Sequence, residues 1–187
     1  MKRFWFSVII LNCLGCNGNV KNPIYNAGGL SVKNFEVGLQ KINNTWFYKK
    51  SLFTGFMIEV EKDNRIVYKL PISKGKENGL ALGWYNSGEK LLKRHYENGL
   101  KEGEFMQWWP NGNLRYLFHY KHDKYNGTLT IFFPNGTKRQ ESNYQDGKEE
   151  GIQRVWNEEG LLVSNYIVKN TKMYGVAIIK SCIPISN

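Results

Sequence analysis

The side chains best suited to chemistry in this chain of 187 residues are its three histidines. His95 and His119 are one 24-residue interval apart and His122 follows closely, so three imidazoles could bind a metal ion such as zinc. The same 24-residue spacing recurs along much of the chain, and histidines that face solvent explain it as well. We therefore predict no metal site and no cofactor.

Motifs of known catalytic sites are missing from the sequence. It contains no Gly-x-Ser-x-Gly, His-Glu-x-x-His or phosphate-loop pattern. Its adjacent carboxylates, Glu149-Glu150 and Glu158-Glu159, would point to opposite faces of a strand, so neither pair is suited to acid and base catalysis. We predict no catalytic residues and expect that the chain is not an enzyme.

The closely spaced cysteines Cys13 and Cys16 fit a redox pair, half a zinc site or a site of lipid attachment. A redox pair is expected at a helix start in a βαβ unit, and a zinc site needs a second pair of ligands. The sequence offers neither. Residues 1–15 instead have the features of an export signal, because a short basic start precedes an apolar stretch at residues 4–11.

Gly15 directly before Cys16 resembles the lipobox of bacterial lipoproteins, in which the signal is removed before a cysteine that carries the lipid. The pattern departs from this resemblance at Cys13, where leucine is usual. The resemblance implies lipidation of Cys16 and an exported protein, anchored in the cell envelope on the periplasmic or surface side. Cys182 would then have no partner for a disulfide.

The chain is basic, with 26 Lys and Arg against 16 Asp and Glu. A basic balance can indicate nucleic acid, anionic lipid or an acidic partner. The basic residues are scattered singly or in pairs, and the longest cluster is Lys90 with Lys93 and Arg94. This scatter is typical of a solvated surface, and we predict no nucleic-acid partner.

Glycine recurs at a 24-residue interval from Gly55 to Gly175, which is the mark of a repeat array. Whole units begin at residues 55, 79, 103, 127 and 151, and a partial unit begins at 175. Two further positions in each unit, nine and twenty residues after the leading glycine, are also glycine in most units. We predict turns there, since the exceptions include Asn64 and Asp123, whose side chains tolerate a left-handed backbone.

Between the glycines, apolar and polar residues alternate, as expected for a strand with one better-buried face. The apolar residues stand at the first, third and fifth positions after the leading glycine, for example Phe56, Ile58 and Val60. An Asn-Gly turn such as Asn111-Gly112 then leads to a second strand. The predicted fold is all-β: an elongated single-layer antiparallel meander of stacked 24-residue β-hairpin repeats.

Aromatic residues should form rows across these hairpins. One face would carry Trp84, Trp108, Phe132 and Trp156. The opposite face would carry Tyr85, Trp109 and Phe133. A single-layer sheet cannot bury both rows, and an exposed apolar row marks a contact surface. We take the second row as the candidate binding surface; the alternative is that curvature and long Lys or Arg side chains cover it. A third set ends the return strands, at Tyr96, Tyr120 and Tyr144.

The segment Gly79–Gly103, with Trp84-Tyr85-Asn86-Ser87-Gly88 and then Tyr96-Glu97-Asn98-Gly99, resembles the variant MORN repeat of many bacterial proteins. The units that begin at Gly103 and Gly127 resemble it as well, and the resemblance covers roughly residues 46–187. It implies a binding or scaffolding module. One branch of that family is described as the antitoxin or immunity half of toxin pairs.

The predicted organisation is a signal peptide at 1–15, a tether and degenerate N-terminal segment at 16–45, and a repeat array at 46–187. The leading hypothesis for function is a lipid-anchored envelope protein that binds a protein or an envelope glycan through the repeats. The alternative is an antitoxin or immunity protein that neutralises a toxin by direct contact. A binder of membrane lipid ranks third.

Overall fold

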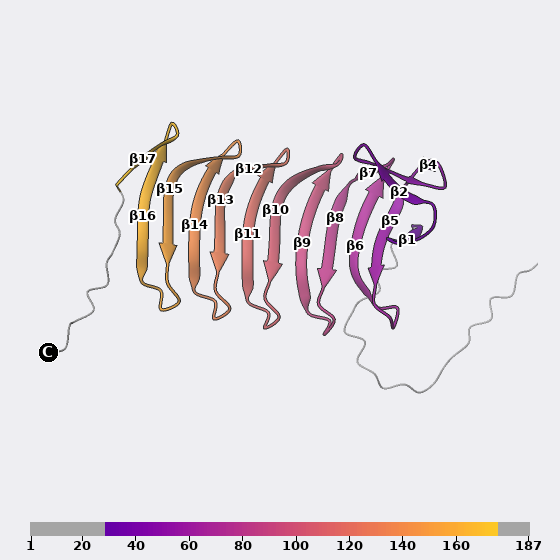
Figure 1. Ribbon diagram of the computed structural model, residues 1–187, viewed down its shortest axis with the longest axis horizontal. Helices are drawn as coiled ribbons and strands as arrows, with labels where there is room; N and C mark the ends of the chain where they lie inside the picture. Colours follow the sequence, from indigo (N-terminus) through magenta and orange to yellow (C-terminus); the bar gives the residue numbers. More distant parts are fainter. Residues whose placement is uncertain (1–28, 176–187) are drawn as a thin grey trace, which may run out of the picture.

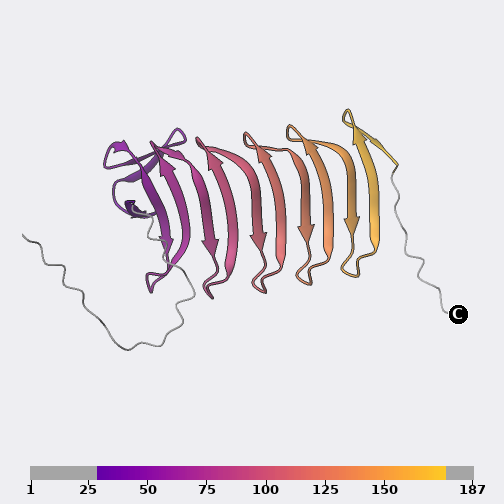
Figure 2. The same cartoon turned by 180° about the vertical axis from the view of Figure 1, so that it is seen from behind.

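The computed structural model of the protein describes residues 29–175, which form two β-sheets and contain no helix (Figure 1). Within this range there is accordingly no helix able to span a membrane. The predicted export signal, Cys16, the partial unit after residue 175 and Cys182 lie outside the described residues. The described ends of the chain lie at opposite ends of the long sheet, as Figure 2 shows from behind.

The larger sheet has 14 strands and runs in chain order over most of its length. Neighbouring strands pair antiparallel, except that β1 and β5 are parallel. This confirms the predicted all-β antiparallel meander. Its strands are β1 (Ser31–Lys33), β5 (Gly55–Val60), β6 (Ile66–Ser73), β7 (Lys76–Glu77), β8 (Gly79–Trp84), β9 (Lys90–Glu97), β10 (Leu100–Trp108), β11 (Leu114–Lys121), β12 (Lys124–Tyr125), β13 (Gly127–Phe132), β14 (Lys138–Gln145), β15 (Lys148–Trp156), β16 (Leu162–Lys169) and β17 (Lys172–Tyr174).

The predicted turns form where the glycine pattern placed them. Positions without glycine adopt the same left-handed backbone, with φ of 63° at Asn64, 65° at Asp123 and 63° at Thr171. Side chains then link the turns of successive repeats. Asn111 Nδ2 donates to the carbonyl of Pro134 at 2.7 Å, and Asn135 Nδ2 donates to that of Glu158 at 3.2 Å.

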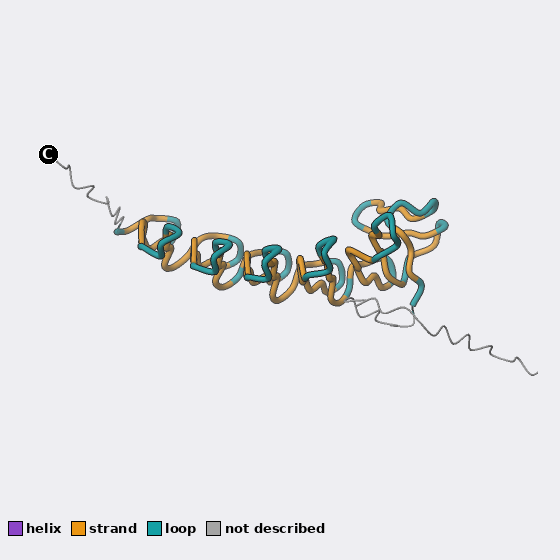
Figure 3. The backbone as a smooth tube through the Cα atoms, turned by 90° about the horizontal axis from the view of Figure 1, so that it is seen from below, coloured by secondary structure: helices purple, strands orange, loops and turns teal. Residues whose placement is uncertain are grey.

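A second, three-stranded sheet covers the N-terminal end of the long one (Figure 3). It contains β2 (Leu39–Ile42), β3 (Thr45–Tyr48) and β4 (Ser51–Leu52). Strands β3 and β4, at the predicted start of the array, thus belong to this second sheet and not to the long one. Residues 31–33, expected in the tether, form the parallel edge strand β1. Between the sheets lies the core, built from Val32, Phe53, Met57, Leu70, Ile72 and Ala81.

The buried face of the long sheet is not the face that the sequence pattern suggested. The second residue after each leading glycine is buried in every unit: Met57, Ala81, Phe105, Leu129 and Gln153. Among the residues expected to be buried, Leu80 is 42% exposed and Ile152 is 37% exposed. We call the side with Phe105 the inner face and the opposite side the outer face. The prediction failed because most apolar side chains of these strands lie on the outer face.

The three-stranded sheet covers only the first part of the inner face. Farther along the chain, aromatic rings cover it instead. The ring of Tyr125, on the two-residue strand β12, lies 5.6 Å from that of Phe118 and 5.3 Å from that of Tyr144. The array therefore closes its inner side by itself and needs no second layer there.

Candidate binding surface

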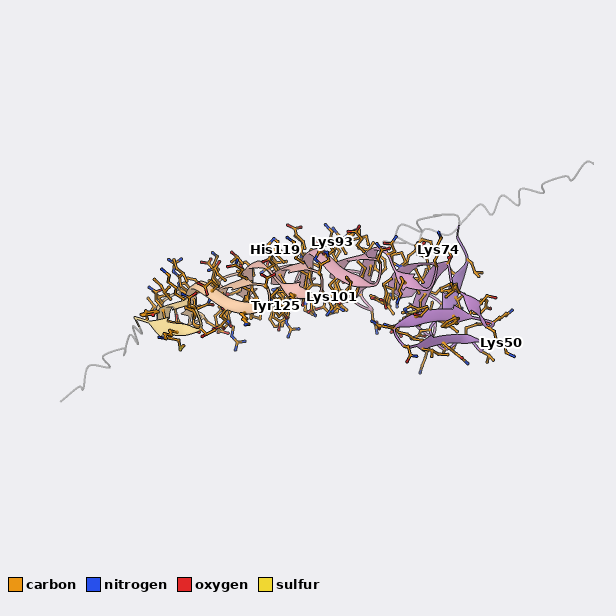
Figure 4. The ribbon with its side chains drawn as sticks, turned by 90° about the horizontal axis from the view of Figure 1, so that it is seen from above. Lys50, Lys74, Lys93, Lys101, His119 and Tyr125 are labelled. Carbon is orange, nitrogen blue, oxygen red and sulfur yellow. The ribbon has the colours of Figure 1, made fainter. Side chains whose placement is uncertain are left out.

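No other strand of residues 29–175 packs on the outer face of the long sheet (Figure 4). Figure 4 shows Lys93 and His119 on this side of the array and Lys101 and Tyr125 on the other. The three-stranded sheet lies on the side of Lys101 and Tyr125. Apolar side chains on the outer face are therefore half-exposed, and such a surface is suited to contact with a partner.

One row of outer-face residues crosses four repeats, next to the turns at Gly88, Gly112, Gly136 and Gly160. It contains the predicted ladder of Trp84, Trp108, Phe132 and Trp156, and each of these residues is half-buried. Each aromatic residue has a cross-strand partner on the return strand of its own hairpin. In strand order the row reads Trp84, Lys90, Trp108, Leu114, Phe132, Lys138, Trp156 and Leu162. We call this set the outer aromatic row.

Lysines and aromatic rings make contact along this row. Lys90 Nζ lies 6.0 Å from the ring centroid of Trp108, and Lys138 Nζ lies 5.9 Å from that of Trp156. A cation over an indole face is attracted by the negative charge density of the ring. The sequence analysis missed these two lysines, although each stands six residues after an aromatic residue of the ladder.

The electrostatic character changes along the row. In the later repeats Glu141 accepts a hydrogen bond from Lys138 at 2.6 Å and one from Arg154 at 3.2 Å. The hydrogen bond from Lys138 is the main reason that the pKa of the Glu141 carboxyl lies below its usual value. In the earlier repeats, no carboxylate of residues 29–175 forms an ion pair with Lys90 or Lys93. On the outer face, Lys90 and Lys93 therefore have no carboxylate partner within residues 29–175, whereas Lys138 and Arg154 share Glu141.

A second row runs beside the first and adds apolar area. Lys93 stands between Leu82 on β8 and Met106 on β10, its cross-strand neighbours. Met106 in turn pairs with Leu117 on β11. Around Lys93 the outer face therefore presents an ammonium group set among half-buried apolar side chains.

The row that the sequence analysis favoured as the binding surface also links successive repeats. Tyr85, Trp109 and Phe133 are half-buried, and the first two donate hydrogen bonds to the next repeat. Tyr85 Oη donates to the carbonyl of Trp108 at 2.7 Å, and Trp109 Nε1 donates to that of Phe132 at 3.2 Å.

Arginine side chains also stack on this row. The guanidinium of Arg115 lies 4.2 Å from the Trp109 ring, and that of Arg139 lies 5.8 Å from the Phe133 ring. Such contacts are the kind that the covered alternative expected, and the three aromatic side chains are half-buried, as are those of the outer aromatic row.

The tyrosines that end the return strands pack on the inner face. The Tyr120 ring lies 4.8 Å from that of Tyr125. Burial, followed by the hydrogen bond with Tyr125, raises the pKa of the Tyr120 hydroxyl. Burial likewise raises the pKa of Tyr144. These residues stabilise the array by packing, which leaves the outer aromatic row as the set available for contact.

The histidines do not converge on one point. His119 Nδ1 lies 2.9 Å from the carbonyl oxygen of Thr128, and its Nε2 lies 3.9 Å from Glu104. His122 occupies a turn with φ of 48°. Nowhere between residues 29 and 175 do three His, Cys, Asp or Glu side chains form a group that could hold a metal ion. The imidazoles are thus accounted for by local contacts and turns.

A shallow recess lies on the inner side, where β9 and β10 lose their regular pairing. Arg94, Lys101, Phe105 and Tyr120 line part of it. The Arg94 guanidinium lies 4.3 Å from the Phe105 ring, and Lys101 Nζ lies 5.3 Å from the Tyr120 ring. Both cations stack on aromatic rings of this recess, and they help to cover the inner face.

Comparison with known proteins agrees with the repeat geometry. The family described as MORN repeat variant matches residues 101–122 and 125–146. The second match begins one 24-residue period after the first, in step with the hairpins of the sheet. No curated protein matches the chain. MORN repeats are in general not enzymes and are consistent with binding or scaffolding. Residues 101–122 and 125–146 are each similar to this repeat, which supports a relation of the array to the MORN-repeat family.

Proposed function

We propose that this chain is a non-catalytic binding protein that contacts a partner through the outer face of its long sheet. The observation that carries the proposal is the outer aromatic row. Its four aromatic side chains are half-buried on a face that no other strand of residues 29–175 covers. Burial of such side chains against a partner would supply favourable free energy, at roughly 25 cal/mol for each Å² of apolar area removed from water.

We further propose that the protein is held in the cell envelope by a lipid on Cys16. Support comes from the basic start, the apolar stretch and the Gly15-Cys16 pair. Cys16 stands a short stretch of chain before Gly29, the first described residue. Since Gly29 precedes the edge strand β1, an anchor at Cys16 would hold the array by its N-terminal end and leave the outer face accessible along its length.

The intact mass of the membrane-extracted protein tests the anchor. We expect an acylated species that begins at Cys16, and we expect the Cys16→Ala variant to lack it. A soluble chain that begins at Met1 would contradict the anchor and would leave the binding surface to be judged separately.

Site-specific photo-crosslinking tests the binding surface in the native host. A photoreactive residue at Leu117 places the probe on the outer face, and one at Lys101 places it on the opposite side of the array, as Figure 4 shows for Lys101. We expect crosslinked products from Leu117 that disappear when Trp108 is changed to Ala. Products from Lys101 alone would refute the outer face as the contact surface.

A further inference from the structure

We infer that the outer face of repeats 79–121 binds a linear, negatively charged glycan, whose sugar rings stack on Trp84 and Trp108 and whose acidic groups lie at Lys90 and Lys93. The inference rests on the proposed function, since it names the class of ligand for that same face. Four observations support it: the direction of the row, its place on an open sheet, its lysines without carboxylate partners and its repetition.

The direction of the row favours a long ligand. Trp84 lies on β8 and Trp108 on β10, with β9 between them. Two strand spacings separate the indoles, which amounts to roughly 9–10 Å. The row continues in the same direction through Phe132 and Trp156, across the strands and along the long axis of the array (Figure 1). A polymer lying on this axis would meet one aromatic ring per repeat.

The shape of the surface favours stacking over enclosure. Small molecules bind in concave pockets that bury most of their surface. The outer face is one side of an open sheet, and its aromatic residues are half-buried side by side. An indole offers a flat apolar surface with a negative face. The C–H groups on one side of a sugar ring are apolar and slightly positive, so this side is complementary to an indole.

The charges favour an acidic ligand. Lys90 is the cross-strand neighbour of Trp84, and its ammonium lies 6.0 Å from the Trp108 ring. No carboxylate within residues 29–175 forms an ion pair with Lys90 or Lys93. In the later repeats Lys138 already binds Glu141 at 2.6 Å. The two ammonium groups beside the first indoles are therefore the ones available to carboxylates or phosphates of a ligand.

Repetition distinguishes a glycan from a folded protein partner. One aromatic side chain recurs in each repeat, at Trp84, Trp108, Phe132 and Trp156. A chain of repeating sugar units can present the same ring at regular intervals and match this series. A folded partner instead concentrates binding energy in a few central side chains that fill pockets. The row has no such centre.

Binding measurements on the full mature chain, extracted in detergent, test the inference. The probe is an eight-residue oligouronate; the comparison ligands are a neutral glucose oligomer of the same length and an eight-residue polyglutamate. We expect the oligouronate to bind and salt to weaken it. Trp108→Ala should weaken binding about tenfold, and so should the Lys90→Gln/Lys93→Gln double variant. Lys101→Gln, on the other side of the array in Figure 4, should leave it unchanged.

The outcomes separate this inference from the proposed function. Trp108→Phe keeps an aromatic ring, whereas Trp108→Ala removes it. Binding that is retained in Trp108→Phe and lost in Trp108→Ala supports stacking, provided that the two variants unfold at the same urea concentration. If polyglutamate binds as tightly as the oligouronate, the inference that the ligand is a glycan is overturned. If the neutral oligomer binds as tightly as the oligouronate, the inference that the ligand is acidic is overturned. Failure of the oligouronate to bind, together with Leu117 crosslinks to a protein, would reject the glycan and keep the outer face as a binding surface.

Discussion

The carboxylate of Glu77 accepts a hydrogen bond from the indole Nε1 of Trp46 at 2.9 Å, although the two residues belong to different sheets. The same oxygen lies 2.8 Å from the ammonium of Lys41. Glu77 is 6% exposed, which makes it a buried acidic residue whose partners both come from the three-stranded sheet. This carboxylate therefore links the N-terminal sheet to the array.

Removal of the Glu77 carboxylate should loosen this link. Glu77→Ala leaves the indole N–H and the Lys41 ammonium without their acceptor; since Lys41 is partly exposed, the unsatisfied indole N–H should account for most of the cost, at about 1–3 kcal/mol. We expect the free energy of unfolding in urea to fall by that amount. Glu97→Gln, at an exposed position on β9, is the control and should change it little. Equal effects of the two variants would show that Glu77 does not link the sheets.

Two glycines with similar backbone angles should respond differently to alanine. Gly75 has φ of +78° and Gly112 has φ of +87°, so alanine is strained at both, at about 1–2 kcal/mol. A Cβ at Gly75 would lie 2.8 Å from the Thr45 side chain in the three-stranded sheet, whereas one at Gly112 would meet open space. We expect Gly75→Ala to cost about 1–3 kcal/mol more than Gly112→Ala in urea unfolding. Equal losses would contradict this close approach.

The sequence predicts the array because each turn depends on a few neighbouring residues. Glycine and Asn-Gly at fixed intervals specify the hairpins, and Asp123 takes the left-handed backbone where glycine is missing. The three-stranded sheet has no such local signal. Its contact with the array joins residues as far apart as Trp46 and Glu77, and no periodic pattern marks that pair.

The site could be predicted only in part, because apolar residues line both faces of the strands. Alternation identifies which residues share a face and correctly places Trp84 and Trp108 in one row. It cannot decide which face the rest of the molecule covers. That depends on Tyr125 and the three-stranded sheet, which lie on the inner side. Nor does alternation show that Arg115 stacks on Trp109 in the neighbouring row.

The last whole repeat carries a buried amide where the others carry apolar side chains. Gln153 is 1% exposed, and its Nε2 donates to the carbonyl of Asn143 at 2.9 Å. Its Oε1 accepts no hydrogen bond from residues 29–175. Gln153→Glu keeps the shape, removes the donor and buries a charge without a partner. We expect a loss of about 2–4 kcal/mol at pH 7.

The loss of stability in Gln153→Glu should shrink as the pH falls. Burial raises the pKa of the new carboxyl above its unfolded value, so its penalty is full at neutral pH and disappears as the pH falls below about 4.3. Urea unfolding of Gln153→Glu across this range, beside the exposed control Gln145→Glu, measures it. A penalty independent of pH would show that the cost arises from lost packing.

Glu141 on the outer face should give the opposite pH dependence. Its carboxylate binds Lys138 and Arg154, and the hydrogen bond from Lys138 is the main cause of its lowered pKa. A folded pKa below the unfolded value means that the unfolded chain binds more protons in acid. The stabilisation that Glu141 provides is therefore complete well above about pH 4.3 and is lost as the pH falls through its lowered pKa.

Urea unfolding at several pH values tests this dependence. Glu141→Gln should be less stable than the parent at pH 7, and the difference should shrink in acid. Glu159→Gln, at an exposed turn, should show no such trend. If the two variants had parallel pH profiles, the ion pairs of Glu141 would contribute nothing to the stability of the later repeats, and their lysine would be as available to a ligand as Lys90.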